Sequence, residues 1–236
     1  LMKLTYRYSY KLIGNSKKLS KDLSKFVNKK VHTIYSPTNF KQLIRMSKNY
    51  KTKDVLKKKS IIRLLSVSRF TKRKDLITLL RAFNIINSKY QNIELILIGY
   101  GSELNTFKQY IKKHNLKNKI FLISYKDNPY PYFLISDLYI MPSLYEGCPN
   151  SIIEATALNL PVISSNCNSG PSEILLNGKG GFIFEKKKHI ELANKIELFI
   201  KNRIIFAKKM AIAKKNIFRF DEKKILKEYM RIFKQI

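Results

Sequence analysis

The sequence predicts an α/β protein built on a doubly wound parallel sheet of the Rossmann-like kind, and three observations lead to this prediction. Six short apolar runs rich in branched residues recur between residues 61 and 185, as in strands that are buried on both faces. Segments with the apolar spacing of helices separate these runs. The hydrophobic content is 44%, which is enough to build a core between helices and sheet.

From residue 60 onward each element can be assigned in chain order. The predicted strands are 61–68, 93–99, 119–124, 137–143, 161–166 and 181–185. The predicted helices are 75–90, 102–113, 130–136, 151–158, 171–178, 189–202, 204–216 and 221–236. Strands that alternate with helices pair in parallel, and such sheets bind ligands in the loops at the carboxyl ends of their strands. A binding site is therefore expected in those loops.

The pattern before residue 60 is weaker. Residues 11–28 favour a helix and residues 29–35 a short strand, which together are too little for a domain. Residues 36–60 have the composition of a connector, and their lysines indicate a solvated face.

The net charge of the chain is +31, and most of it comes from lysine. Asparagine and isoleucine are abundant as well, so the composition of an AT-rich genome is one explanation. Attraction to anionic lipid or to nucleic acid is the functional explanation. The two explanations are compatible, and both stay open.

Cysteines, histidines and apolar runs exclude several other classes of protein. Cys148 and Cys167 do not have the spacing of a zinc site, and the three histidines are scattered, so we expect no metal. No apolar run approaches the roughly 18 residues that span a bilayer. The N-terminus is too polar for a signal peptide. The sequence therefore predicts a cytoplasmic protein that can rest on the inner face of the membrane.

The loops after the first two predicted strands carry charge and glycine. Arg69 and Lys74 belong to a basic loop that opens onto a helix, a combination suited to a diphosphate because cations and helix N-terminal amides act together. The alternative is a solvated run of charge. Gly99 and Gly101 follow the second strand and let the backbone approach a neighbour closely, although a tight turn explains them equally.

The loops after the fourth and fifth strands carry carboxylates. Glu146 stands beside Gly147 and near Pro149, so we expect a rigid loop that exposes this carboxylate in a cleft. Glu173 follows another Gly-Pro loop, where its charge would favour the start of its own helix.

Two interpretations apply to the helix that begins near residue 150. Ser151 and Glu154 have the spacing of a capping box, in which the glutamate binds a backbone amide at the helix start. Alternatively, Glu154 is a ligand-binding carboxylate. The backbone amides of Asn150, Ser151 and Ile152 lie at the same helix start and could bind a phosphate.

Three motifs, in this order and spacing, resemble those of the GT4 family of retaining glycosyltransferases. EGCPNSIIE (146–154) is similar to the family's E-x7-E signature. SGPSEIL (169–175) is similar to its S-G-P-x-E-I-L stretch. SVSRFTKRKDLITLLRAF (66–83) is similar to the family's V-G-R-L-x-x-x-K-x-x-x-x-L-x-x-A-F segment. Together the motifs cover residues 60 to 185.

The resemblance implies a GT-B fold, with two Rossmann-like domains and a nucleotide-sugar donor held mainly by the C-terminal one. It implies that Arg69 and Lys74 bind the donor diphosphate, together with the amides of residues 150–152. It implies that Glu154 binds the ribose and that Glu146 contacts the transferred sugar as the catalytic-site carboxylate. It implies no metal, and no DxD motif occurs in the sequence. Cationic side chains would then neutralise the charge that a metal neutralises elsewhere.

The sequence departs from the family pattern at several positions. Ser68 precedes Arg69 and Asp75 follows Lys74, where glycines are common. Neither departure removes a positive charge, so the phosphate assignment stands. Ser124 and Tyr125 replace a common glycine, which indicates an altered pocket for the base.

The resemblance also predicts the domain organisation. Residues 1–40 resemble only the last helix and strand of the family's N-terminal acceptor domain, and residues 41–59 resemble a connector. Residues 60–216 form the predicted nucleotide-sugar-binding domain, and residues 217–236 the helix that crosses back to the N-terminal domain. The rest of that domain, which carries the acceptor site, a Gly-rich loop and a histidine, has no counterpart here. We therefore expect a fragment, a truncated reading frame or one half of a split enzyme.

The sequence as a whole predicts a glycosyltransferase that takes a sugar from a UDP-linked donor. The predicted acceptor is a glycan or a lipid-linked glycan of a surface polysaccharide, and the predicted partner is a missing N-terminal half. A non-catalytic remnant is the alternative. A basic nucleic-acid-binding protein ranks last, because the aromatic residues have core spacing and do not interleave with the basic ones.

Overall fold

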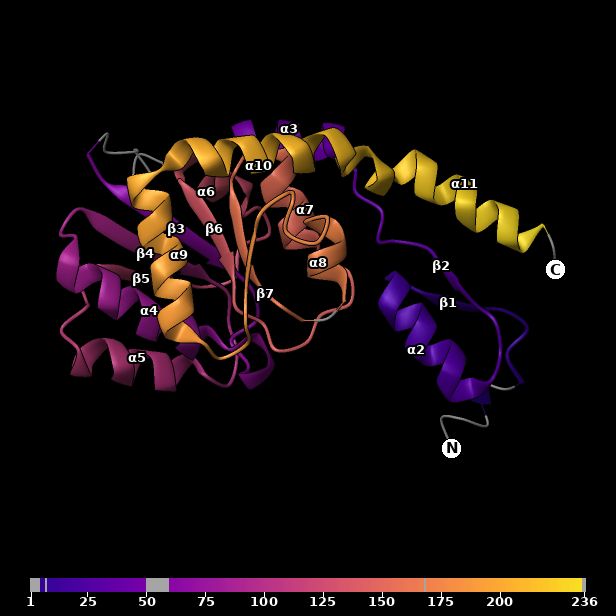
Figure 1. The fold of residues 1–236 in the computed structure, drawn as a ribbon, viewed down its shortest axis with the longest axis horizontal. Coiled ribbons are helices and arrows are strands. Elements are labelled where there is room, and N and C mark those ends of the chain that lie inside the picture. The colour runs from indigo at the N-terminus through magenta and orange to yellow at the C-terminus, as the bar shows by residue number, and fades with distance from the viewer. Residues whose placement is uncertain (1–4, 7, 50–59, 168, 235–236) are drawn as a thin grey trace.

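The sheet that the sequence predicts is present, with all six strands parallel. The structure is a computed structural model that describes residues 5–6, 8–49, 60–167 and 169–234. The strands are β3 (Ile62–Val67), β4 (Ile93–Ile98), β5 (Ile120–Ile123), β6 (Leu138–Met141), β7 (Val162–Ser165) and β8 (Phe182–Phe184). Their order in the sheet is β5-β4-β3-β6-β7-β8 (Figure 1). The predicted fold class is confirmed.

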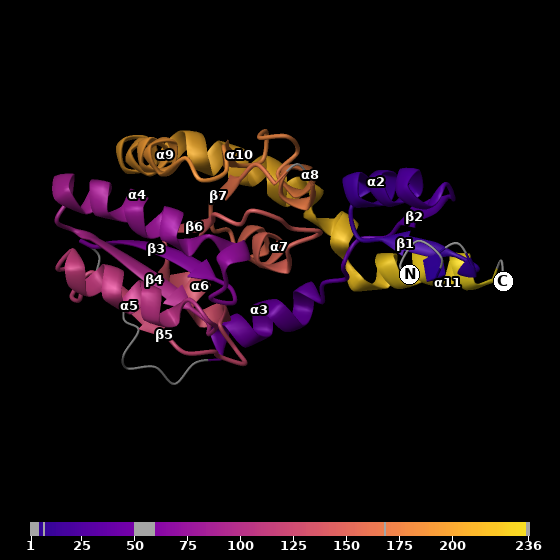
Figure 2. The ribbon, with the colours of Figure 1, turned by 90° about the horizontal axis from the view of Figure 1, so that it is seen from below.

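Helices cover both faces of this sheet. One face packs against α4 (Leu76–Lys89), α5 (Leu104–Lys113), α9 (His189–Lys201) and the start of α10 (Arg203–Asn216). The other face packs against α6 (Tyr130–Ile135), α7 (Asn150–Ala157) and α8 (Gly170–Ile174). In Figure 2, α4 and α9 lie on one side of the strands and α3 on the other. The central strands are mostly apolar because both of their faces are buried, as in β6, where all four residues are buried.

The first described part of the chain forms a separate two-stranded parallel sheet. It consists of β1 (Leu12–Gly14) and β2 (Val31–Thr33), joined by α2 (Lys17–Val27). The strand expected near residues 29–35 is therefore confirmed as β2. The helix expected from residue 11 is wrong at its start, because residues 12–14 form a strand and α2 begins only after the N-cap Ser16.

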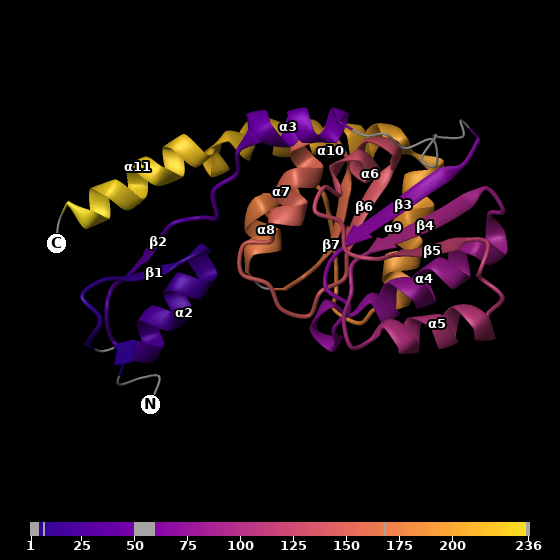
Figure 3. The same ribbon diagram turned by 180° about the vertical axis from the view of Figure 1, so that it is seen from behind.

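The last helix returns to this small sheet. α11 (Glu222–Phe233) follows η3 (Ile217–Phe220) and buries Ile225 and Ile232 around Ile34, next to β2. Figures 1 and 3 show α11, α2, β1 and β2 together at one end of the molecule, beyond the large sheet. The N-terminal segment and the last helix are thus packed together. No helix within the described ranges is long and apolar enough to cross a membrane.

A helix that the sequence did not predict lies in the expected connector. α3 (Phe40–Lys48) begins at Asn39, whose side chain accepts a hydrogen bond from the amide of Gln42 at 2.8 Å. Its Leu43 is buried in the core that α6 and α7 share. The lysines of this helix, Lys41 and Lys48, are exposed as expected, but the other side of the helix, with Leu43 and Ser47, is buried, so residues 40–48 are more than a solvated connector. Residues 50–59 of the same predicted segment lie outside the described residues.

Glu173 joins the N-terminal segment to the large sheet. Its carboxylate accepts hydrogen bonds from the backbone amides of Lys17 and Lys18, each at 2.9 Å, and from the Tyr35 hydroxyl at 3.1 Å. Burial and the neighbouring Glu173 raise the pKa of Tyr35 to about 12. Glu173 does lie in the first turn of α8, as expected, but its oxygens bind the N-terminus of α2. A carboxylate at that position satisfies free amides and favours the helix dipole.

We predict that Glu173→Ala loosens the N-terminal segment while the large sheet stays folded. The substitution leaves two helix-start amides and one buried hydroxyl without their acceptor, which should cost about 2 kcal/mol. Hydrogen exchange of the amides in residues 12–35 should become faster, while exchange in β3 to β6 is unchanged. Glu228→Ala is the matched control, because the Glu228 side chain on α11 makes no hydrogen bond or ion pair in the described part of the chain. Equal exchange in the two variants would contradict this role.

Candidate functional site

The candidate site lies where the order of the strands reverses. The chain proceeds outward from β3 through β4 to β5, then returns to the other side of β3 and continues through β6 and β7 to β8. The loops after β3 and β6 therefore leave the sheet in opposite directions, which opens a crevice between their carboxyl ends. The loop after β3 carries Arg69 and Lys74, and the loop after β6 carries Glu146.

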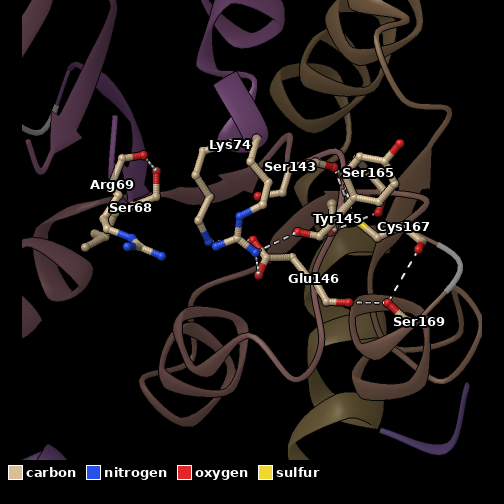
Figure 4. A network of polar contacts seen from close by, with 12 residues as sticks. Ser68, Arg69, Lys74, Ser143, Tyr145, Glu146, Ser165, Cys167 and Ser169 are labelled. Carbon is tan, nitrogen blue, oxygen red and sulfur yellow. Dashed lines mark hydrogen bonds and ion pairs between the residues drawn. The ribbon is translucent and has the colours of Figure 1, made fainter. Parts of the chain in front are cut away.

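An ion pair connects these two loops. The Lys74 ammonium donates to Glu146 Oε1 at 2.5 Å, and Arg73 Nη1 lies 4.0 Å from the other oxygen (Figure 4). The side chains of Lys74 and Glu146 are only 15% and 7% exposed. The expectation that Glu146 is exposed in a cleft is therefore wrong, because Lys74 covers it. The backbone supports the same contact, since the Leu144 amide donates to the Arg73 carbonyl at 2.9 Å.

The loop that carries Glu146 is held from below by the loop after β7. The Ser169 hydroxyl donates to the Glu146 carbonyl, and the Ser165 hydroxyl and Cys167 thiol donate to the Ser143 carbonyl (Figure 4). The two loops approach so closely that a Cβ on Gly170 would lie 1.6 Å from the Gly147 carbonyl oxygen. The position of Glu146 is thus fixed by several independent contacts.

Gly99 and Gly101 serve the loop after β3. Both have positive φ angles, and a Cβ would lie 1.9 Å from the Ser68 carbonyl oxygen at Gly99 and 2.3 Å from the Phe70 carbonyl oxygen at Gly101. The Phe70 amide donates to the Tyr100 carbonyl across this contact. The glycines therefore let the loop after β4 pack against the backbone of the segment that carries Arg69.

A cavity of about 400 Å³ opens beside Arg69. Its lining includes the exposed Arg69 and three tyrosines, Tyr100, Tyr125 and Tyr130. Tyr100 and Tyr125 meet edge to face, with ring centroids 5.9 Å apart. Figure 4 shows the Arg69 side chain extending toward the Lys74–Glu146 pair. The cavity thus joins an aromatic wall to the cationic crevice.

Glu154 lies on α7, next to Tyr130 of α6. The Tyr130 hydroxyl donates to Glu154 Oε1 at 3.3 Å, and both residues line a second cavity of about 300 Å³ next to α3. Burial raises the pKa of Glu154 to about 7, although the bond from Tyr130 acts in the opposite direction. The capping-box interpretation is wrong, because the helix cap is Pro149 and the Glu154 carboxylate binds Tyr130. Glu154 is therefore a carboxylate that changes protonation near neutral pH and has room for a ligand beside it.

The start of α7 offers fewer amides than expected. The Ile152 amide already donates to the Pro149 carbonyl at 3.2 Å, so the prediction that it binds a phosphate loses support. Asn150 is exposed and lines the cavity next to Glu154, and the amides of Asn150 and Ser151 are the first of a helix, which have no acceptor within it. These two amides stay candidates for a ligand.

Sequence reasoning missed the aromatic part of the site. Tyr130 connects the two cavities, because it lines both, and it holds Glu154. Tyr100 stands between the two glycines of the loop after β4, which was the one local signal for it. The departure at Tyr125, by contrast, had indicated an altered pocket, and Tyr125 does line the cavity. Among the residues that the structure describes, no three histidine, cysteine or acidic side chains come close enough to hold a metal ion.

Comparison with known proteins places this geometry in a family. A family model described as "Glycosyl transferases group 1" matches residues 46–217, a range that contains every residue named above in the crevice and the two cavities. The match covers most of the chain.

Individual relatives extend beyond the region that the chain covers. An uncharacterized glycosyltransferase of Methanocaldococcus jannaschii is 32% identical over 73% of this chain and 44% of the relative. A poly(ribitol-phosphate) alpha-N-acetylglucosaminyltransferase of Staphylococcus aureus is 24% identical over 86% of this chain and 40% of the relative. The chain therefore spans less than half the length of these relatives.

The fold is also found in solved structures. The crystal structure of the Anabaena protein HepE in complex with UDP-glucose has a TM-score of 0.86 against this chain at 20% identity, over 99% of this chain and 66% of that one. The match includes the N-terminal segment as well as the large sheet, because only 1% of this chain lies outside it.

We predict that Lys74→Ala destabilises the protein by about 3 kcal/mol, since it leaves a buried carboxylate without its closest cation. Urea denaturation measures this loss as a lower midpoint. Lys89→Ala is the matched control, because Lys89 is 52% exposed in its ion pair with Glu197, and an exposed pair is worth less than about 1 kcal/mol. A loss for Lys74→Ala no larger than that of the control would show that Glu146 does not depend on this pair.

Proposed function

The chain belongs to the group 1 glycosyltransferases, and from this premise we propose that it is the donor-binding half of a retaining, GT4-type enzyme with a GT-B fold. The proposed donor is a UDP-sugar. The observation that carries the proposal is the grouping of Arg69, Lys74 and Glu146 at the strand-order reversal, beside a cavity that shares Tyr130 with the cavity at Glu154. A carboxylate, cations and an aromatic pocket match the parts of a nucleotide-sugar: sugar, diphosphate and base.

Each part of the donor has a proposed partner. Arg69 and Lys74 bind the diphosphate, assisted by the amides of Asn150 and Ser151 at the start of α7. Glu154 accepts hydrogen bonds from the ribose hydroxyls, for which it replaces its bond to Tyr130. The aromatic wall of Tyr100 and Tyr125 covers the base, which is supported by their place in the 400 Å³ cavity. The UDP-glucose complex of the related fold supports UDP as the nucleotide.

In the proposed reaction the bond between the anomeric carbon and the diphosphate oxygen breaks, and that oxygen leaves with the electron pair. Arg69 and Lys74 stabilise the negative charge that develops on the leaving group. The acceptor hydroxyl forms the new bond on the same face of the sugar, and its proton passes to the departing diphosphate. Glu146, oriented by Lys74, accepts hydrogen bonds from the sugar hydroxyls, and we do not assign it as a covalent nucleophile.

The proposal includes the acceptor and the location. We propose a glycan or lipid-linked acceptor of a surface polysaccharide, supported by the name of the Staphylococcus aureus relative, which acts on poly(ribitol-phosphate). An acceptor at a membrane suits a chain of charge +31, because basic surfaces are attracted to anionic lipid on the cytoplasmic side. The acceptor domain itself would come from the additional length that the relatives have.

We predict that UDP binds and that its affinity depends on pH through Glu154. With a pKa of about 7 this group is mostly protonated at pH 6 and mostly ionised at pH 8, and only the carboxylate accepts two hydroxyl hydrogen bonds. The affinity ratio of wild type to Glu154→Gln should therefore rise about fivefold from pH 6 to pH 8. The protonation of UDP changes with pH as well, but it is the same for both proteins and cancels in the ratio of their affinities. Isothermal calorimetry at moderate salt measures both affinities.

Two further results decide the role of Glu154. Glu154→Ala should weaken UDP binding by more than tenfold at pH 8, since a hydrogen bond to a charged group is worth about 1.5–3 kcal/mol. Glu228→Gln, which changes a distant glutamate on α11, should leave the affinity as in wild type. If the Glu154→Ala variant binds UDP as tightly as the wild type, Glu154 does not hold the ribose and the donor assignment fails.

A further inference from the structure

An exposed aromatic residue stands at the mouth of the crevice. Tyr145 directly precedes the buried Glu146, yet its side chain is 64% exposed. The Lys186 ammonium lies over its ring, 5.1 Å from the ring centroid, and Arg73 Nη1 donates to its backbone carbonyl at 3.3 Å. Tyr145 therefore has a cation on one face of its ring and a second cation at its backbone, while much of the ring stays in contact with solvent.

Two basic runs converge at this tyrosine from distant parts of the sheet. Residues 72–74 follow β3, and residues 186–188 follow β8, three strands away at the edge of the sheet. Their side chains nevertheless act on the same groups. Burial raises the pKa of Cys167, Glu146 raises it further, and Lys186 and Lys74 both lower it. Arg73 and Lys186 thus meet at Tyr145, and together with Lys74 they form the cationic rim of the crevice.

Two acidic groups near this rim are buried, whereas Glu185, which directly precedes Lys186, is exposed and accepts from the Asn166 side chain. The Glu146 side chain is 7% exposed and pairs with Lys74, and Asp75 is buried, where its carboxylate accepts from Thr78 at 2.7 Å. Lys186, in contrast, makes no ion pair within the described ranges, and the ring of Tyr145 restricts its position. An incoming molecule therefore meets Lys186 and Arg73 at Tyr145, with Glu146 buried beneath them and Glu185 exposed next to Lys186.

We propose that Lys186 and Tyr145, supported by Arg73, form a subsite that binds a phosphate group of the acceptor. The inference rests on the proposed function, because the subsite lies at the entrance to the proposed sugar position. An ammonium binds phosphate through charge-assisted hydrogen bonds. The exposed part of the Tyr145 ring covers the C–H groups of the sugar or polyol that carries the phosphate. Arg69 and Lys74 are already assigned to the donor diphosphate, so these rim cations are available for the acceptor.

Two kinds of acceptor supply this chemistry. One is a polyol-phosphate polymer, with phosphodiesters between its units, of the kind in the name of the Staphylococcus aureus relative. The other is a lipid-linked acceptor, whose diphosphate joins the glycan to the lipid. A nucleic acid also carries phosphodiesters, and its bases can stack on an exposed tyrosine, so an oligonucleotide has to be compared directly.

The test measures binding of three probes to the 236-residue chain at moderate salt. The probes are a short oligo(ribitol phosphate), a water-soluble short-chain isoprenyl diphosphate and a single-stranded oligonucleotide of the same charge. The variants are Lys186→Gln and Tyr145→Ala. Lys112→Gln is the matched control, because it removes one exposed lysine near the C-terminal end of α5, on the side of the fold away from the rim. UDP affinity, measured in the same samples, reports whether the donor site is intact.

We expect Lys186→Gln to weaken the binding of one of the first two probes about fivefold, which is the upper limit for a single exposed charge contact. The probe whose binding is weakened then identifies the source of the phosphate. Tyr145→Ala should weaken the same probe, while Lys112→Gln leaves it unchanged. Two results would overturn the subsite and indicate non-specific electrostatic binding. One is an equal loss of affinity in Lys186→Gln and Lys112→Gln, and the other is an oligonucleotide that binds as tightly as the better of the two probes. Absence of UDP binding to the wild type contradicts the proposed function itself, whereas UDP binding without either phosphate probe contradicts only the subsite.

Discussion

The site depends on one buried ion pair, in which Lys74 and Glu146 join loops that leave the sheet in opposite directions. A carboxylate with 7% exposure requires a cation, so the segment after β3 must stay close to the segment after β6. The remaining contacts support this arrangement from each side. Gly101 lets the loop after β4 pack against Phe70, and Ser169 holds the carbonyl of Glu146 from the loop after β7. The crevice is therefore preorganised, which is what electrostatic stabilisation of a leaving group requires.

The large sheet could be predicted from the sequence because its signals are local and strong. Short apolar runs predicted all six strands, which are three to six residues long in the structure, and helical spacing predicted the helices between them. The N-terminal region was harder, since β1 has only three residues and merges with the pattern of α2. α3 was missed for another reason. Its apolar residues are few, and Leu43 is buried only because α6 and α7 lie next to it.

The site was predictable in its members but not in its contacts. Residue type and motif spacing identified the cations and both glutamates. Whether a carboxylate is exposed depends on its partner, and nothing near Glu146 in the sequence indicates that a lysine 72 residues away covers it. In the same way, the spacing of Ser151 and Glu154 predicts a cap, but a proline occupies the cap position and Tyr130 reaches Glu154 from the preceding helix. Tertiary contacts override local preference at these positions.

Where the net charge of +31 acts on the surface depends on where the few carboxylates lie. A biased genome can supply many lysines, but it does not decide where 16 acidic residues lie. Glu146 and Asp75 lie beneath the rim, and Glu173 binds a helix start, so their negative charges are used inside the fold. Lys186 is left at the mouth of the crevice without an ion pair in the described part of the chain, although the exposed Glu185 precedes it. In the proposed function this is where two phosphate-bearing molecules meet, so a lysine that the composition supplies freely gains a local electrostatic role there.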